Sequence, residues 1–376
     1  MLMKTRSLAA FLLASMAPLC AHAAHVKDPK ASYIDVNARR VELKKTKNPR
    51  IREAIAALPS CVKLPTVPAP VGRMKIPWHY INGSHGAVNP KEAEATRVYL
   101  SFEKRVTAGM NQWLAHGDEA EAKCAVDQMD DWAKAGALID YEPKESSQSW
   151  YQAGWTLSSI AISESVLVND KKIDAATHAR LIAWMNKAAH KLIDFDKKSK
   201  QRNNLHYWRG LAATAVGVIS SDDDLFTYGV NTFKEAVDEI DQRGALPQEM
   251  KRNERAIHYQ SFALQPLIPI ASFAERQDVY LYNYSSLSGR HLDDAVIFLG
   301  DAMANPAIVK NYIADKQMTD FDAPDFLAAI ELALHHYDLS RLPKPIQAGL
   351  QKPTYATRIG GSMTVIAAPS KQEKRK

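Results

Sequence analysis

The chain has 376 residues, of which 46% are hydrophobic, enough to bury a large core in one big domain or two small ones. Its formal net charge is +6, with 48 Lys and Arg against 42 Asp and Glu. This mild basicity suits an acidic polymer, and nucleic acid is disfavoured because no zinc-finger, helix-turn-helix or RNA-binding motif is present.

The first 23 residues have the pattern of a secretory signal. A positively charged start precedes an apolar run over residues 8–19, and Ala-His-Ala at 21–23 matches an A-x-A cleavage site. The alternative is a lipoprotein anchor on Cys20, which the bulky Leu19 before it argues against. We therefore expect a cleavable signal peptide over 1–23, a periplasmic location and no membrane span.

Removal of the signal leaves two cysteines, Cys61 and Cys124. An even pair in an oxidising compartment is expected to form a disulfide, here pinning the N-terminal loop to the second long helix. Closing a loop of this size stabilises by a few kcal/mol in the chain-entropy model. The alternative is two buried free thiols.

Residues 24–60 form a charged N-terminal arm, which we expect to be loosely held, with one short helix and then a small helix over 50–58. A Pro-rich connector over 65–70 follows, because proline lacks the donor that regular structure needs. At the other end, residues 367–376 are expected to be a solvated basic tail.

The segment 74–89 is rich in aromatic and flexible residues, including Trp78, His79 and Tyr80. Such a composition is typical of a lid loop over an active site. The alternative is a surface loop anchored by Trp78.

The rest of the chain has the apolar spacing of helices, at i, i+3 and i+4, with strand-like alternation nearly absent. No linker divides it, so we expect an all-α architecture of long antiparallel helices joined by short loops. The expected helices cover 91–115, 119–137, 148–168, 173–196, 204–219, 223–241, 253–275, 291–303 and 322–338.

The stretch 202–210 concentrates amide, imidazole, phenol and guanidinium groups where a helix is expected to begin. Unpaired backbone N–H groups at a helix start add to side-chain donors and can hold an anion, so a carboxylated ligand is the first hypothesis. The alternative is an ordinary helix N-cap at Asn203 or Asn204, with Tyr207 and Trp208 in the core.

This stretch resembles the N-N-H-x-Y-W motif of the alginate lyase family. A second block, 244–267, is similar to that family's G-x-L-P-x-E-x-x-R…R-A…A-L-x-P-L segment. Two shorter segments, 132–137 and 358–361, also resemble the family. The resemblance covers roughly 61–366. It implies one domain folded as an incomplete (α/α) toroid or barrel of antiparallel helix pairs, with the lid near 74–89.

The resemblance also implies cleavage of a (1→4)-linked polyuronate by β-elimination, without a cofactor. In the family an Asn, a His and an Arg surround the uronate carboxylate, and a Tyr acts as the acid and in many members also as the base. The Asn and the Arg correspond to Asn204 and Arg255, whereas the His position is Leu205 and the Tyr position is Phe262. Neither leucine nor phenylalanine can carry a proton.

Three explanations stay open. Proton transfer has moved to neighbouring groups, or the protein is a catalytically impaired module that binds an acidic exopolysaccharide, or the substrate is not a uronan. Under the first, the catalytic candidates are His206, Tyr259 and Tyr80. A one-residue step along a helix turns a side chain by about 100°, which makes His206 awkward.

Substrate contacts are expected from Asn204, Arg255, His79, Trp78 and Tyr207. No metal is expected, because the adjacent His335 and His336 cannot both point at one ion from a regular helix. The expected protein is a monomer whose partner is an acidic polysaccharide, with alginate, a glucuronan and a mixed exopolysaccharide left open.

Overall fold

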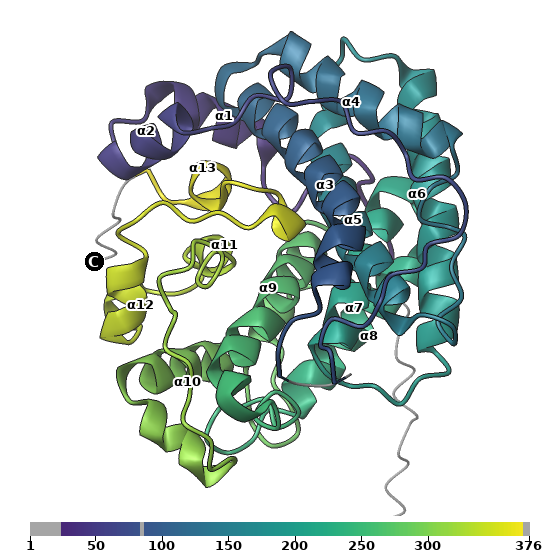
Figure 1. Ribbon diagram of the computed structural model, residues 1–376. Coiled ribbons are helices and arrows are strands. Elements are labelled where there is room, and N and C mark those ends of the chain that lie inside the picture. Colours follow the sequence, from purple (N-terminus) through teal and green to yellow (C-terminus); the bar gives the residue numbers. More distant parts are fainter. Residues whose placement is uncertain (1–23, 83–85, 371–376) are drawn as a thin grey trace, which may run out of the picture.

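The computed structural model describes residues 24–82 and 86–370, so the expected signal segment 1–23, the lid tip 83–85 and the end of the basic tail, 371–376, lie outside the described residues. The described chain is helical, and its extended pairings are isolated bridges, Tyr80 to Val88 and Ala356 to Gly361. In chain order (Figure 1) the helices are α1 (Val36–Lys45), α2 (Pro49–Ala56), α3 (Pro90–His116), α4 (Glu119–Lys134), α5 (Ser147–Leu167), α6 (Ala175–Asp196), α7 (Asn204–Ser220), α8 (Asp223–Asp238), α9 (Ala256–Glu275), α10 (Leu292–Ala304), α11 (Ile330–Ala333), α12 (Lys344–Gly349) and α13 (Met363–Ala367).

The long helices form two layers. The helices α3, α5, α7 and α9 pack next to one another as an inner layer, and α4, α6 and α8 cover its outer side. Tight connections such as Gly117-Asp118 send the chain from an inner helix back along an outer one. The later helices continue the arc towards α1 and α2, where α13 contacts both (Figure 1). This is the expected incomplete α/α toroid.

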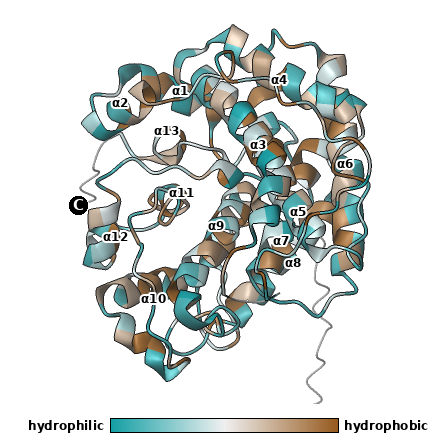
Figure 2. Cartoon of the chain, in the orientation of Figure 1, coloured by the Kyte–Doolittle hydropathy of each residue, from teal (hydrophilic) through white to brown (hydrophobic). Residues whose placement is uncertain are grey.

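Of the inner helices, α5, α7 and α9 are buried on nearly every side because they lie between the outer layer and the centre of the ring. Hydrophobic residues run along α5 and α9 in Figure 2. Apart from residues at the helix ends, the positions of α5, α7 and α9 that are not fully buried are few. They are Tyr151 on α5, Leu205 on α7, and His258, Tyr259 and Phe262 on α9.

The expected helix over 322–338 is wrong. Only α11 is α-helical there. The rest contains turns closed by i to i+3 bonds, such as those from Phe326 N–H to Ala323 and from Ala328 N–H to Asp325. The segment still buries its apolar residues from Phe326 to Ala333. Apolar spacing fits three residues per turn as well as 3.6, so the sequence pattern did not separate the two.

The N-terminal arm is not loosely held, contrary to expectation. Its α1 and α2 are capped by Asp35 and Asn48, and the buried Arg39 donates hydrogen bonds to the carbonyls of Thr364, Val365 and Ala368. A single buried guanidinium with several carbonyl partners ties the arm to the C-terminal segment. Composition alone did not show these partners.

The disulfide between Cys61 and Cys124 is confirmed, with a Cα–Cα distance of 6.0 Å. It links the loop after α2 to α4, the second long helix. Within residues 24–82 and 86–370, none of the helices is long and apolar enough to cross a membrane.

Candidate active site

Tyr80 and Tyr259 form a pair of phenols at the edge of the inner layer. Their hydroxyl oxygens are 3.1 Å apart, although the residues are 179 positions apart in the chain. Tyr259 is on the first turn of α9, and Tyr80 is on the lid segment, where its bridge to Val88 fixes the backbone. The structure thus brings these two catalytic candidates together, and their catalytic role stays a prediction.

Arg252 and Arg255 surround this phenol pair. The guanidinium carbon of Arg252 lies 3.9 Å from the centroid of the Tyr259 ring, and that of Arg255 lies 5.3 Å from the centroid of the Tyr80 ring. The residues Asn253–Arg255 form a 3₁₀ turn before α9. Arg252 precedes this turn and Arg255 ends it, and both line the same pocket.

The two phenols and two guanidiniums line a pocket of about 140 Å³ together with Lys251, Asn253 and Glu254. Glu254 is the one acid in this lining, and its Oε1 is 3.5 Å from Nε of Arg255. That Nε is buried and has no hydrogen-bond partner in the described part of the chain. With Lys251, Arg252 and Arg255 against Glu254, the pocket lining carries more positive than negative charge, which favours the binding of a carboxylate.

The phenol of Tyr80 keeps its proton at neutral pH. Burial, with the neighbouring Tyr259 hydroxyl, raises the pKa of Tyr80 to about 12, although the positive charges of Arg255 and Arg252 oppose the shift. A protonated phenol donates a hydrogen bond and can supply a proton to a basic oxygen. Tyr80 is therefore suited to the role of acid.

Asn204 is not part of this pocket. It is 1% exposed at the first residue of α7, where its backbone N–H and its Nδ2 donate to the two carboxyl oxygens of Glu249, at 2.6 Å and 2.8 Å. Its Oδ1 has no partner in the described chain. Glu249 therefore determines which way the amide faces, a role that sequence analysis missed although the P-x-E pattern contains this residue.

Replacing Glu249 with Gln is expected to change how stability depends on pH. Burial raises the pKa of Glu249 from 4.5 to about 7, although the two Asn204 hydrogen bonds oppose the shift. Because the folded-state pKa is the higher one, the protonated carboxyl contributes stability that is complete below pH 4.5 and is lost as the pH rises through 7. Glu249→Gln should remove a pH-dependent loss of up to about 3 kcal/mol in the free energy of unfolding.

Urea denaturation of both proteins across this pH range measures the difference. Glu254→Gln, a change of the same kind at a partly exposed carboxyl, is the control. Parallel pH profiles for the wild type and Glu249→Gln would show that the buried carboxyl ionises as an ordinary glutamate.

His206 points away from the site, so its proposed catalytic role is not supported. Its Nδ1 is hydrogen-bonded to Asp196 and its Nε2 lies 3.2 Å from Glu235, inside a buried network that also contains Arg209 and Tyr228. The turn of about 100° from Leu205 to the next residue accounts for this direction. His206 holds α7 against α6 and α8.

Tyr207 is 1% exposed and belongs to the core, so the expected contact with substrate is wrong. Trp78, in contrast, is 62% exposed, and His79 stands beside Tyr80 with ring centroids 4.5 Å apart. Nδ1 of His79 is 3.2 Å from Glu92 on α3. Trp78 and His79 are thus the aromatic side chains that the lid segment presents near the phenol pair.

Leu205 and Phe262 are partly buried against the core, and Phe262 lies among aromatic rings. Its centroid is 5.3 Å from that of Trp208 and 6.3 Å from that of Trp155. No proton-carrying group occupies either of the two positions.

Arg358, whose R-I-G-G motif was noted in the sequence without a role, lies against aromatic rings of the inner layer. Its guanidinium carbon lies 4.0 Å from the centroid of Trp155 and 5.9 Å from that of Phe262. The following Gly360 and Gly361 have φ values of 117° and 99°, which side chains rarely adopt, and this turn brings the C-terminal segment to the inner layer. Arg358 adds a cation beside the position of Phe262.

Comparisons with known proteins give the following matches. The family model described as "Alginate lyase" matches residues 22–309. An alginate lyase of Pseudomonas syringae pv. syringae (strain B728a) is 30% identical over 291 residues, 74% of each chain. The crystal structure of alginate lyase A1-III from Sphingomonas species A1 superposes with a TM-score of 0.84 at 35% identity, covering 92% of this chain and 97% of that one. A Bacteroides ovatus alginate lyase, 17% identical, shares the fold with a TM-score of 0.63.

Proposed function

The chain belongs to the alginate lyase family, and from this membership we propose that it is a polysaccharide lyase that cleaves alginate or a similar (1→4)-linked polyuronate by β-elimination. We further propose that it does so in the periplasm with an altered acid and base set. A tetrasaccharide occupies a solved complex of alginate lyase A1-III, which supports a polysaccharide substrate. The signal-like start of the chain supports the location.

The observation that carries the proposal is the phenol pair between two guanidiniums. The pocket contains Tyr80, Tyr259, Arg252 and Arg255, so groups that transfer protons lie beside groups that neutralise a carboxylate. β-Elimination needs this combination, because the proton on C5 becomes acidic only when the neighbouring carboxylate is neutralised.

In the proposed reaction the guanidinium of Arg255 binds the uronate carboxylate in the pocket. Tyr259, acting in its phenolate form, removes the C5 proton, the electrons form the C4–C5 double bond, and the C4–O4 bond breaks. A proton from the pair then neutralises the departing O4. Tyr259 is the residue that contacts the sugar, and Tyr80 exchanges a proton with it across the 3.1 Å hydrogen bond. The reaction is redox-neutral and consumes no water.

A second function is favoured by Leu205 and Phe262. Because both positions lack a transferable proton, the protein could bind an acidic exopolysaccharide without cleaving it, through the same pocket. The first function includes cleavage of the polymer and the second does not, whereas both need Arg255 to bind it.

Incubation with mannuronate-rich alginate, guluronate-rich alginate and a glucuronan distinguishes the two. A lyase produces the ultraviolet band of the unsaturated uronate, and we expect this band with at least one polymer. Retention on the polymer without new absorbance would support the binding function instead. Absence of both would reject both.

A further inference from the structure

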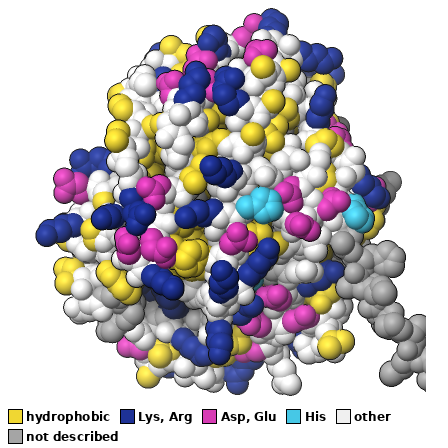
Figure 3. Space-filling model, turned by 90° about the vertical axis from the view of Figure 1, so that its right-hand side faces the viewer, with side chains coloured by type: hydrophobic (Ala, Val, Ile, Leu, Met, Phe, Trp, Pro, Cys, Tyr) yellow, Lys and Arg dark blue, Asp and Glu magenta, His cyan; other side chains and the backbone are white. Residues whose placement is uncertain are grey.

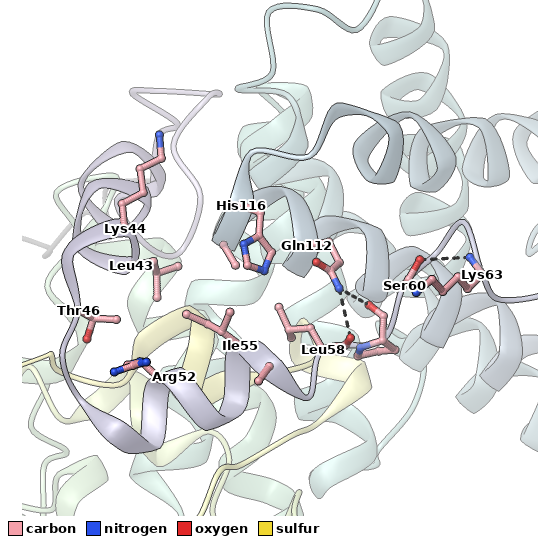
Figure 4. A pocket seen from close by; sticks show the side chains of 13 residues that line it. Leu43, Lys44, Thr46, Arg52, Ile55, Leu58, Ser60, Lys63, Gln112 and His116 are labelled. Atoms are coloured by element: carbon pink, nitrogen blue, oxygen red, sulfur yellow. Dashed lines mark hydrogen bonds between the residues drawn. The ribbon is translucent and has the colours of Figure 1, made fainter.

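A second cavity in the described chain lies outside the site above. It is a trough of about 960 Å³ between the arm helices α1 and α2 and the C-terminal end of α3. In Figure 4, His116 on α3 faces Ile55 on α2 across it, whereas Gln112 on α3 donates hydrogen bonds to the carbonyls of Leu58 and Pro59, both at 3.2 Å. It shares no lining residue with the pocket at Tyr80 and Tyr259. Its lining consists of Leu43, Lys44, Thr46, Arg52, Ile55, Ala56, Leu58, Pro59, Ser60, Lys63, Gln112, Ala115 and His116.

The trough has an unbalanced charge. Lys44, Arg52 and Lys63 line it with His116, and the lining includes no Asp or Glu. All four side chains are exposed, and none of them forms an ion pair or a side-chain hydrogen bond in the described part of the chain. On the face drawn in Figure 3, by comparison, basic and acidic side chains are interspersed. Unpaired cations gathered in a concave surface favour an anionic ligand.

The apolar part of the trough indicates the class of anion. Leu43, Ile55 and Leu58 provide hydrocarbon surface between the cations, and Gln112 adds an amide. Sugar rings present C–H faces that pack on such surface, while uronate carboxylates can pair with lysine and arginine. Single-stranded nucleic acid relies on aromatic platforms for its bases, and no Phe, Tyr or Trp lines this cavity. An acidic sugar chain is the better fit.

The wall of the trough is fixed in place. The backbone N–H of Cys61 donates to Glu121 at 2.6 Å, Arg105 donates to the carbonyl of Cys61 at 2.6 Å, and the disulfide to Cys124 anchors the same residue to α4. On the opposite side, Arg50 pairs with the buried Glu331 and holds α2. A wall already held in position loses little freedom when a ligand binds.

We propose that this trough is a second, non-catalytic binding site for the acidic polysaccharide. It would hold one stretch of the polysaccharide at a distance from the pocket at Tyr80 and Tyr259. The identity of the polymer rests on the proposed function. Holding a long chain at two places raises its local concentration at the catalytic pocket without adding any contact there.

The variant Lys44→Ala/Arg52→Ala/Lys63→Ala tests this site. The control, Lys187→Ala/Arg276→Ala/Lys310→Ala, removes the same number of positive charges from exposed, unpaired positions outside the trough. Affinity electrophoresis through gels containing alginate measures the dissociation constant of the full mature chain. We expect it to rise about tenfold in the trough variant and less than about twofold in the control.

Two further measurements distinguish binding at the trough from binding at the pocket of Tyr80 and Tyr259. In a protein that already carries Arg255→Ala, the remaining retention on alginate should disappear when the three trough substitutions are introduced as well. With short uronate oligomers, which fill only the groove, kcat/KM should be unchanged in the trough variant, whereas KM for long polymer should rise. Thermal melting confirms that both triple variants are folded.

Equal dissociation constants in the trough variant and the control would overturn the proposal. It would also be overturned if the trough variant lost retention on single-stranded DNA while keeping retention on alginate. Trough-dependent retention of a uronan that the wild type does not cleave would refute the lyase function and leave this site standing.

Discussion

Replacing Tyr259 with Phe is expected to lower the rate of polyuronate cleavage by about 10²- to 10⁴-fold, the range over which a positioned acid or base contributes. The change removes one hydroxyl from a ring that stays between Arg252 and Tyr80. The carboxylate contact through Arg255 is kept, so KM should change little while kcat falls. Initial rates of unsaturated-uronate formation over a range of polymer concentrations separate the two constants.

Tyr284→Phe is the matched control for that variant. Its hydroxyl donates to Asp238 at 3.0 Å on the surface, away from the pocket, so the same chemical change should leave the rate unaltered. If Tyr259→Phe retained the wild-type kcat, the phenol pair would have no role in proton transfer, and the proposed acid and base would be wrong.

The double change Leu205→His with Phe262→Tyr is expected to raise the cleavage rate by about 10²-fold, the lower end of the contribution of acid–base groups. It introduces proton-carrying side chains at the positions where the resemblance places the family's His and Tyr. Both positions are only partly buried, so the new polar atoms can reach water or substrate without being trapped unsatisfied in the core. Arg358 lies close to the added hydroxyl, 5.9 Å from the present ring.

Leu205→Gln with Phe262→Tyr is the control, because glutamine is polar but cannot exchange a proton as imidazole does. If the wild type shows no turnover and Leu205→His with Phe262→Tyr gains cleavage activity, the wild type is a binding protein. The gain would also show that its pocket still holds C5 of the sugar in the right place. No gain in either would mean that the inner helices no longer hold the sugar at these two positions.

Several features could be read from local sequence. The start of α7 after Asn203 follows from its side chain, which accepts a hydrogen bond from the N–H of Leu205 as an N-cap does. The spacing of Arg255 and Tyr259 placed them on one side of a helix start, and both line the pocket. The cysteine pair was sufficient to predict the disulfide, because Cys61 and Cys124 are the two cysteines left after the signal.

Other features required the tertiary structure. The direction of His206 follows from its buried partners Asp196 and Glu235, which come from two other helices. Glu249, 45 residues from Asn204, orients that amide. Arg358 reaches the inner layer from the C-terminal segment. None of these partners is visible in local spacing.

The sequence by itself determined the helical period, the caps, the cysteine pair and the loss of both family proton carriers, because each depends on the identity of residues or on neighbours within a few positions. The tertiary structure decided which polar side chains face the pocket and which serve the core. That choice depends on burial and on partners distant in the chain, since a buried polar group must find a partner wherever packing brings one. For the same reason the basic trough became visible only when α1, α2 and the end of α3 had been brought together.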